Sequence, residues 1–201
     1  MLARALSGAV LGIDAYQVTV EADVASGLPS FSTVGLPQGA VKEGKDRVVS
    51  AIQNSGYVIP PRRITINLAP SDVPKSGSAF DLPVAVSILA STGQMHSVER
   101  LERFALVGEL SLDGALRPVR GGLPLALHAR DSGLAGIVVP EANVAEAAVV
   151  DGLEVRGAAT LDPLTPLAER ACRQIERYLA DPEFRFTLPF DYCGAEFQCR
   201  V

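Results

Sequence analysis

The 201-residue sequence has no tryptophan, only two histidines and only three cysteines. The cysteines, Cys172, Cys193 and Cys199, lie close to the C-terminal end, and their spacing matches neither a paired-cysteine zinc site nor a disulfide framework. We therefore expect free thiols in a reducing compartment. His96 and His128 stand alone, without a second histidine or an acidic residue at the spacing of metal ligands. These absences predict a protein without a resident metal.

Long hydrophobic runs are also missing. The longest apolar stretches, 82–90 and 133–140, are far shorter than the roughly 20 residues that a helix needs to cross a bilayer. The N-terminus has neither the apolar core nor the cleavage site of a signal peptide. We therefore expect a cytoplasmic protein with no membrane contact. A hydrophobic content of 48% with 20% charged residues is ordinary for one globular domain with a short appendage.

The sequence has no excess of positive charge, because 18 lysines and arginines face 23 acidic residues, for a net charge of −5. Binding of nucleic acid by bulk electrostatics is therefore excluded, and any such contact must be local. The segment 38–75 is the exception, with six basic residues against three acidic ones. Arg62, Arg63 and Lys75, together with Lys42 and Lys45, are its candidate contacts to DNA phosphates or to a partner. The alternative is that these charges only solvate one face.

A phosphate-binding loop of the form G-x-x-x-x-G-K-[ST] does not occur in the 201-residue sequence. The segment 72–78 contains lysine, glycine and serine in the wrong order, and we interpret it as a surface loop. No nucleotide or cofactor is therefore expected to bind this chain.

Hydrophobic periodicity predicts the elements of the first half. Alternation over 5–10 and 16–22 around Gly12-Ile13-Asp14 indicates a β-hairpin, and 31–36 a third strand. An apolar stripe from Val41 to Ile52 predicts a helix that ends at Asn54-Ser55-Gly56. The run 63–68 alternates as a central strand does. The run 79–90 is apolar on all sides, which favours a buried helix with Pro83 in its first turn.

The second half alternates strands with helices. Strands are predicted at 104–112 and 116–119, separated by the hairpin signal Asp113-Gly114. A helix at 121–132, a strand at 136–139, a short helix at 141–149 and a strand at 154–156 follow. This alternation indicates an α/β layer fold. A final helix with Leu167 to Leu179 in its stripe precedes a tail, 184–201, without helical period.

Three sequence blocks carry a resemblance to a known family. They are GLPSFSTVGLP at 27–37 with AVKE at 40–43, RRITINLAP at 62–70 leading into GSAFDLPVA at 77–85, and VGEL at 107–110 with DG at 113–114 and RPVRG at 117–121. Over residues 1–165 the chain resembles the N-terminal domain of the ComM/YifB family of magnesium-chelatase-like ATPases, and more distantly the C-terminal domain of the RadA recombination protein.

The resemblance implies an α/β (α+β) fold, that of Lon proteolytic domains and of the second domain of ribosomal protein S5. It also implies self-association, because the family forms rings around an AAA+ motor that binds ATP and Mg²⁺ and is associated with DNA branch migration in natural transformation. We expect a Lon-like domain at 1–165 and, at 166–201, a helix and irregular tail truncated before such a motor.

A Lon peptidase needs a serine nucleophile and a lysine base. The Lon loop P-K-D-G-P-S-A-G is similar to 74–81 without a gap, which gives Ala79 at the nucleophile position. The Lon segment that leads to the lysine is similar to 118–124, which gives Leu123 or Pro124 at the base position. None of these side chains can exchange a proton, so the resemblance implies no catalytic residue.

A displaced dyad is the alternative, with Ser78 as nucleophile and Lys75 or Lys45 as base; Ser76 is a further serine in the same loop. The simpler interpretation is that Ser78 caps the helix that starts near Ala79, with Asp81 complementing the helix dipole. Three functional hypotheses follow: a non-catalytic scaffold, a residual serine peptidase and a nucleotide-binding protein.

Overall fold

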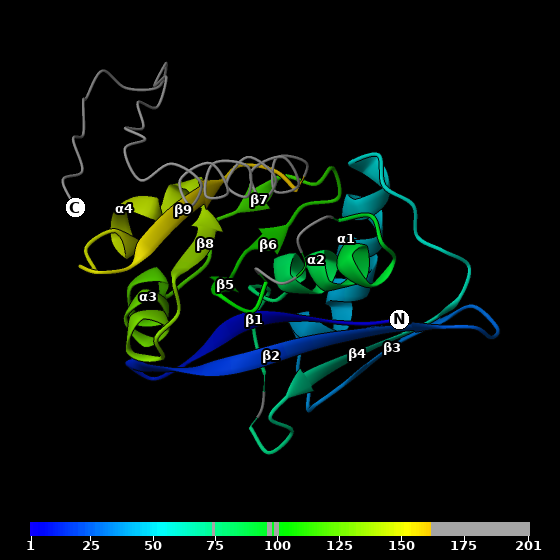
Figure 1. The fold of residues 1–201 in the computed structure, drawn as a ribbon, viewed down its shortest axis with the longest axis horizontal. Coiled ribbons are helices and arrows are strands. Elements are labelled where there is room, and N and C mark those ends of the chain that lie inside the picture. Colours follow the sequence, from blue (N-terminus) through cyan, green and yellow to red (C-terminus); the bar gives the residue numbers. More distant parts are fainter. Residues whose placement is uncertain (74, 96–97, 99–100, 162–201) are drawn as a thin grey trace, which may run out of the picture.

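The computed structural model describes residues 1–73, 75–95, 98 and 101–161. It is a mixed α/β structure with a seven-stranded sheet in the order β3-β4-β2-β1-β5-β8-β9 (Figure 1). Two of the neighbouring pairs, β1 with β2 and β2 with β4, are antiparallel, and the other four are parallel. The predicted helix and tail after residue 165 lie outside the described residues.

The hairpin predicted at the N-terminus is confirmed. Strand β1 spans Leu2–Leu11 and β2 spans Asp14–Ala25, and they pair from Leu2 with Asp23 to Leu11 with Asp14. Their alternate residues are buried, because one face carries the main core. The turn depends on Gly12, whose φ of 67° suits glycine.

Two parallel strands with a crossover helix complete this half of the sheet. Strand β3 covers Ser30–Val34 and β4 covers Arg63–Ala69, with helix α1 at Ala40–Asn54 between them. The predicted end of α1 is confirmed, since Gly56 adopts a φ of 84°. As predicted, β4 lies inside the sheet.

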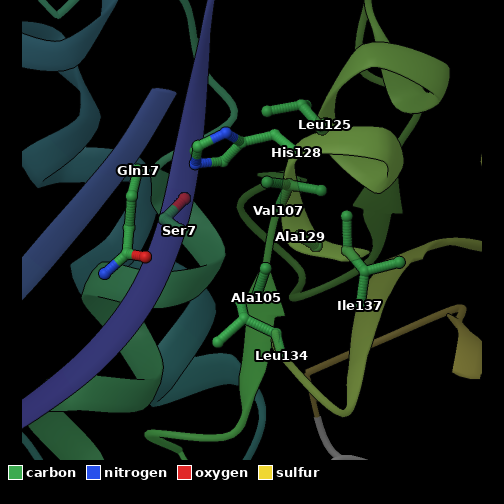
Figure 2. Close-up of a pocket in the computed structure, with 10 residues that line it drawn as sticks. Ser7, Gln17, Ala105, Val107, Leu125, His128, Ala129, Leu134 and Ile137 are labelled. Atoms are coloured by element: carbon green, nitrogen blue, oxygen red, sulfur yellow. The ribbon is translucent and has the colours of Figure 1, made fainter. Parts of the chain in front are cut away.

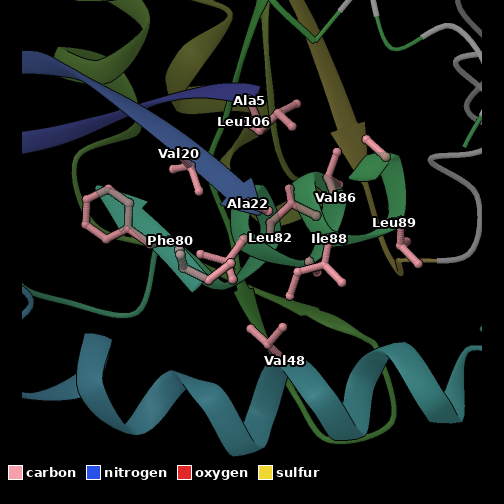
Figure 3. Close-up of a cluster of buried hydrophobic side chains, with 14 of the residues drawn as sticks. Ala5, Val20, Ala22, Val48, Phe80, Leu82, Val86, Ile88, Leu89 and Leu106 are labelled. Carbon is pink, nitrogen blue, oxygen red and sulfur yellow. The ribbon is translucent and has the colours of Figure 1, made fainter. Parts of the chain in front are cut away.

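Helix α2, Asp81–Ser91, is buried along its entire length, as its all-round apolar sequence predicts. It lies between α1 and the strands β1 and β2, with Leu82, Val86 and Ile88 in the main core (Figure 3). Strand β4 supplies Ile64, Ile66 and Leu68 to that core from its inner face. Burying side chains of this size contributes about 1.5–3 kcal/mol each to folding.

The prediction of one strand over 104–112 is wrong. The chain instead forms β5 at Phe104–Leu106 in the large sheet and β6 at Glu109–Leu110, which pairs with β7 at Leu116–Arg117 in a separate two-stranded sheet. The break falls at Gly108, whose backbone N–H donates to the carbonyl of Ala79 and where an added Cβ would come within 3.0 Å of Leu116 and 3.3 Å of Leu82. At Gly108 the backbone lies close to the start of α2, and the chain leaves the large sheet after β5 to form β6.

The remaining elements follow the predicted order. Helix α3 spans Gly122–Asp131, β8 spans Gly136–Pro140, a 3-10 turn (Glu141–Asn143) leads into α4 at Val144–Ala147, and β9 spans Glu154–Ala158. Helix α3 packs on β1, β2 and β8 and contributes to a second apolar cluster with Leu125, Ala126 and Ala129. It lies against the face of β1 opposite to α2, because a Cβ on Gly8 would meet Leu125 at 2.6 Å.

Candidate functional site

The position that resembles the Lon nucleophile lies just before α2. Ala79 is half-buried, and its carbonyl accepts the N–H of Gly108 at 2.9 Å. Because β3 and β4 run parallel, the loop before α2 and the loop that enters α1 both leave from the carboxyl ends of these strands (Figure 1). Open α/β sheets bind their ligands at the carboxyl ends of the strands. The side chain available at this point is a methyl group, which carries no acid, base or nucleophile.

The predicted cap by Ser78 is wrong. Helix α2 begins at Asp81 with Phe80 at its N-cap, and no side chain caps it. The hydroxyl of Ser78 instead donates a hydrogen bond to the carboxylate of Glu109 on β6. Glu109 also lies 3.7 Å from the guanidinium of Arg117 on β7, so β6 and β7 are tied to the loop before α2.

The strongest polar contact at this site joins α1 to α2. The guanidinium of Arg47 donates to both carboxylate oxygens of Asp81, at 2.7 and 3.1 Å, and to the carbonyl of Ala40 at 2.9 Å. The N–H of Leu110 adds a longer bond to the same carboxylate at 3.3 Å. Burial raises the pKa of Asp81, and the hydrogen bonds from Arg47 oppose that shift.

Sequence reasoning placed Asp81 at the helix N-terminus but missed its partner. The sequence does hint at this partner, because Asp81 is the only charged residue of the buried helix α2. A buried carboxylate is costly unless a cation or hydrogen-bond donors lie beside it. The approach of α1 depends on Gly44, since a Cβ there would come within 2.7 Å of the Asp81 carboxylate.

Lys75 is the largest correction to the predicted site. We expected it on the surface, but it is 0% exposed and its amine nitrogen has no hydrogen-bond partner among the described residues. Its backbone fixes it there, because its N–H donates to Leu36 and its carbonyl accepts from Gln38. Burial lowers the pKa of the Lys75 amine, and the nearby Asp72 carboxylate partly opposes this. The side chain is therefore unavailable to DNA.

The positions that resemble the Lon lysine lie in the first turn of α3. Leu123 is 36% exposed and its N–H donates to the carboxylate of Glu146 at 3.0 Å, while Pro124 is half-buried. The turn is supported by Asn143, whose side chain bonds both the N–H and the carbonyl of Val119. Ala79 lies just before α2, whereas Leu123 and Pro124 lie in α3, and these two helices contribute to different apolar clusters.

The other predicted cations do not form one surface. Arg62 and Arg63 are exposed, and Arg63 faces away from the core because Ile64 beside it points inward. Lys42 and Lys45 are exposed on α1, which packs on α2 and contributes to the main core on the inner side of the sheet. The structure therefore places Arg63 on the outer face of the sheet and the two lysines of α1 on the opposite side.

A hollow lies between β1, β5, α3 and β8, and two polar residues, Ser7 and His128, are among those that line it (Figure 2). It is too tight to admit a water molecule. The Ser7 hydroxyl is buried and has no hydrogen-bond partner among the described residues, whereas His128 contacts the Ser132 hydroxyl at 3.3 Å. We interpret this hollow as imperfect packing, not as a ligand site.

Two further features are absent from the described part of the chain. No group of three or more histidine, cysteine or acidic side chains could hold a metal ion there. No helix among those residues is long and apolar enough to cross a membrane.

The mixed sheet and the helices against it define a Lon-like α/β domain. The chain shares 28% identity over 170 residues with a Lon protease of Salinispora arenicola, which covers 80% of this chain and 21% of that protein.

Residues 20–143 match the family model of subunit ChlI of Mg-chelatase, and the chain belongs to that family, in its ComM/YifB group. An uncharacterised protein of Mycobacterium tuberculosis is 48% identical over 163 residues, 81% of this chain and 32% of the relative. YifB of Escherichia coli is 47% identical over 144 residues, 72% and 28% respectively. The competence protein ComM of Haemophilus influenzae is 42% identical over 160 residues, which cover 80% of this chain and 31% of the relative. The chain thus spans about a third of the length of these relatives.

Proposed function

We propose that this chain is a non-catalytic Lon-like domain that serves as a self-association scaffold in a ComM/YifB-type protein. The name of the Haemophilus influenzae relative supports a role connected with competence. Any use of ATP and Mg²⁺, and any branch migration of DNA, would belong to a motor domain that these 201 residues do not contain. In this proposal the Lon-like domain provides contacts between copies, and the motor domain provides the ATP-dependent reaction.

The arrangement around α2 is the observation that carries the proposal. A serine–lysine peptidase needs a hydroxyl in hydrogen-bond reach of a neutral amine. Here the Ser78 hydroxyl donates to Glu109, and the Lys75 amine has no hydrogen-bond partner among the described residues. The two groups that a relocated dyad would use are therefore not engaged with one another, and Lys45 is exposed on α1.

A residual peptidase is the alternative function, and a serine-directed fluorophosphonate probe distinguishes it from a scaffold. We expect no labelling of Ser76 or Ser78 in the purified chain. Labelling that disappears in Lys75→Ala, but persists in Lys45→Ala, would instead establish a working dyad and overturn the non-catalytic assignment.

Self-association is tested by sedimentation velocity over a concentration series. We expect a concentration-dependent increase in sedimentation coefficient, because the scaffold proposal requires contacts between copies. A chain that sediments as a monomer at every concentration would contradict the proposal. Calorimetric titration with ATP and Mg²⁺ should give no heat of binding, since the sequence lacks a phosphate-binding loop.

A further inference from the structure

The loop before α1 and the loop before α2 meet at a short parallel bridge between Pro37 and Lys75. Two backbone hydrogen bonds form it: the N–H of Gln38 donates to the carbonyl of Lys75 at 2.8 Å, and the N–H of Lys75 donates to the carbonyl of Leu36 at 3.2 Å. Both loops follow the carboxyl ends of β3 and β4 (Figure 1). Because the bridge lies beyond these strands, it can open while they stay paired.

Two energetically unfavourable features meet at this bridge. The Lys75 side chain is 0% exposed, and its amine nitrogen has no hydrogen-bond partner among the described residues. An ammonium group in that position is strongly destabilised, because burial removes its water and no bond replaces it. Leu36 adopts a φ of 54°, in the left-handed region that is unfavourable for residues with a side chain. The closed bridge therefore combines a buried amine with a strained backbone.

The charge nearest in effect to the Lys75 amine does not compensate for its burial. Asp72 is the described charged group that acts on this amine, but it is exposed and forms no hydrogen bond with it. Burial lowers the pKa of the Lys75 amine, and the Asp72 carboxylate opposes the shift without cancelling it. The closed bridge therefore suits the neutral amine, whereas the ammonium form needs water.

We propose that Lys75 is a proton-controlled latch: the bridge is closed when its amine is neutral and opens when the amine is protonated, which releases the ammonium group into water. Opening separates Lys75 from Leu36 and Gln38 and leaves β3 and β4 paired. It changes the surface between the Lon-like position Ala79 and the start of α1. The latch operates within one copy of the chain and does not depend on self-association.

The two sides of the bridge are held with different firmness. Gly35 packs directly on the end of β4, because a Cβ there would come within 2.1 Å of the carbonyl oxygen of Leu68. On the other side, Gly77 adopts a φ of 89°, and a Cβ there would meet no atom within 4 Å. The next residue, Ser78, is anchored by the hydrogen bond of its hydroxyl. Lys75 therefore moves away on opening, while the loop before α1 stays in place.

The dependence on pH follows from the two states of the amine. In the open state Lys75 is in water, where its pKa is that of an ordinary lysine, about 10.4. In the closed state burial lowers this pKa. As the pH falls from about 10.4 toward the pKa of the closed state, the open state binds the proton more tightly and its population rises. Below the pKa of the closed state both states are protonated, and the open population levels off.

Amide hydrogen exchange, followed by NMR in the full chain, tests the latch with the Gln38 N–H as the reporter. Each rate is divided by the intrinsic exchange rate at the same pH. At neutral pH we expect Gln38 to exchange at least about tenfold faster than Ile66, a buried residue of β4, because the opening is local. This difference should shrink as the pH rises toward about 10.4.

Two substitutions separate the charge of Lys75 from its size. Lys75→Met cannot be protonated, so it should hold the bridge closed and slow Gln38 exchange relative to Ile66 about tenfold or more at neutral pH. Lys75→Arg stays charged at every pH used, so its Gln38 exchange should be fast and independent of pH. Lys42→Met removes an exposed cation from α1 and should behave like the unmodified chain. Circular dichroism checks that each variant is folded.

The outcomes decide between a latch and a static buried lysine. Slower exchange in Lys75→Met, together with exchange independent of pH in Lys75→Arg, would establish the latch. Gln38 exchange as slow as that of Ile66 in the unmodified chain would overturn it, because the bridge would then open only on global unfolding. Equal Gln38 exchange in Lys75→Met and the unmodified chain at neutral pH would also overturn it. Sedimentation measures self-association separately, so either failure leaves the scaffold proposal standing.

Discussion

Individual residues of this domain differ most from expectation where polar groups are buried. Lys75 and Ser7 each bury a polar atom that no described residue bonds, and such groups destabilise a fold unless they are satisfied. The Lon-like positions Ala79, Leu123 and Pro124, by contrast, carry no titratable group. The two buried polar atoms without a partner among the described residues therefore lie at Ser7 and at Lys75, the candidate base of a displaced dyad, and not at the three Lon-like positions.

Lys75 gives a prediction about pH. Its pKa in the folded protein is lowered by burial, so the unfolded chain binds the proton more tightly and the folded state is penalised at neutral pH. That penalty shrinks as pH rises toward the ordinary lysine pKa of about 10.4. Lys75→Met should therefore raise the free energy of unfolding by about 1–3 kcal/mol at neutral pH, and by less near pH 10.

Urea denaturation at the two pH values measures this effect, with Lys45→Met as the control because Lys45 is exposed on α1. We expect Lys45→Met to change stability little at either pH. A loss of stability in Lys75→Met at neutral pH would show that the amine has a favourable role in the fold.

Ion pairs and backbone hydrogen bonds hold the secondary-structure elements together at the candidate site. Arg47 on α1 bonds Asp81 at the start of α2, and Gly108 between β5 and β6 donates to Ala79. Both contacts join segments far apart in the sequence. Periodicity predicted the helices themselves, but the partner of Asp81 and the break after β5 depend on which elements pack together.

Removing Arg47 tests the contact between α1 and α2. Arg47→Ala leaves the Asp81 carboxylate, whose side chain is 4% exposed, without its counter-charge. We expect it to lower the free energy of unfolding by about 3 kcal/mol, measured by chemical denaturation. Lys42→Ala on the same helix should have little effect, because Lys42 is exposed. Equal losses in the two variants would show that the ion pair adds nothing to stability.

The whole molecule determines whether the predicted cations act together. Lys75 is buried, and Arg63 lies on the face of the sheet opposite to the side that carries Lys42 and Lys45 on α1. With a net charge of −5, long-range attraction of DNA is not expected. Contact with DNA therefore remains a proposal, and only one of the two faces would meet a duplex.

Arg62 and Arg63 are the more promising pair, because they adjoin one another at the exposed start of β4. If they contact phosphates, the double variant Arg62→Ala/Arg63→Ala should bind a duplex more weakly whatever its sequence, and the salt dependence of log K should flatten by about two. Fluorescence anisotropy across a salt series measures both. Lys42→Ala/Lys45→Ala should bind like the unmodified chain, and the reverse result would place the contact on α1.

The sequence by itself determined most of the order of strands and helices, the buried character of α2 and the family, because hydrophobic periodicity and local motifs are properties of neighbouring residues. The resemblance to Lon also led to the prediction that alanine, leucine and proline occupy the positions of the peptidase hydroxyl and amine. Only the tertiary structure decided that Lys75 is buried, that Ser78 bonds Glu109, that Arg47 neutralises Asp81 and that β3 is an open edge. These depend on which distant segments pack together, and burial sets both the pKa of a group and its access to a partner.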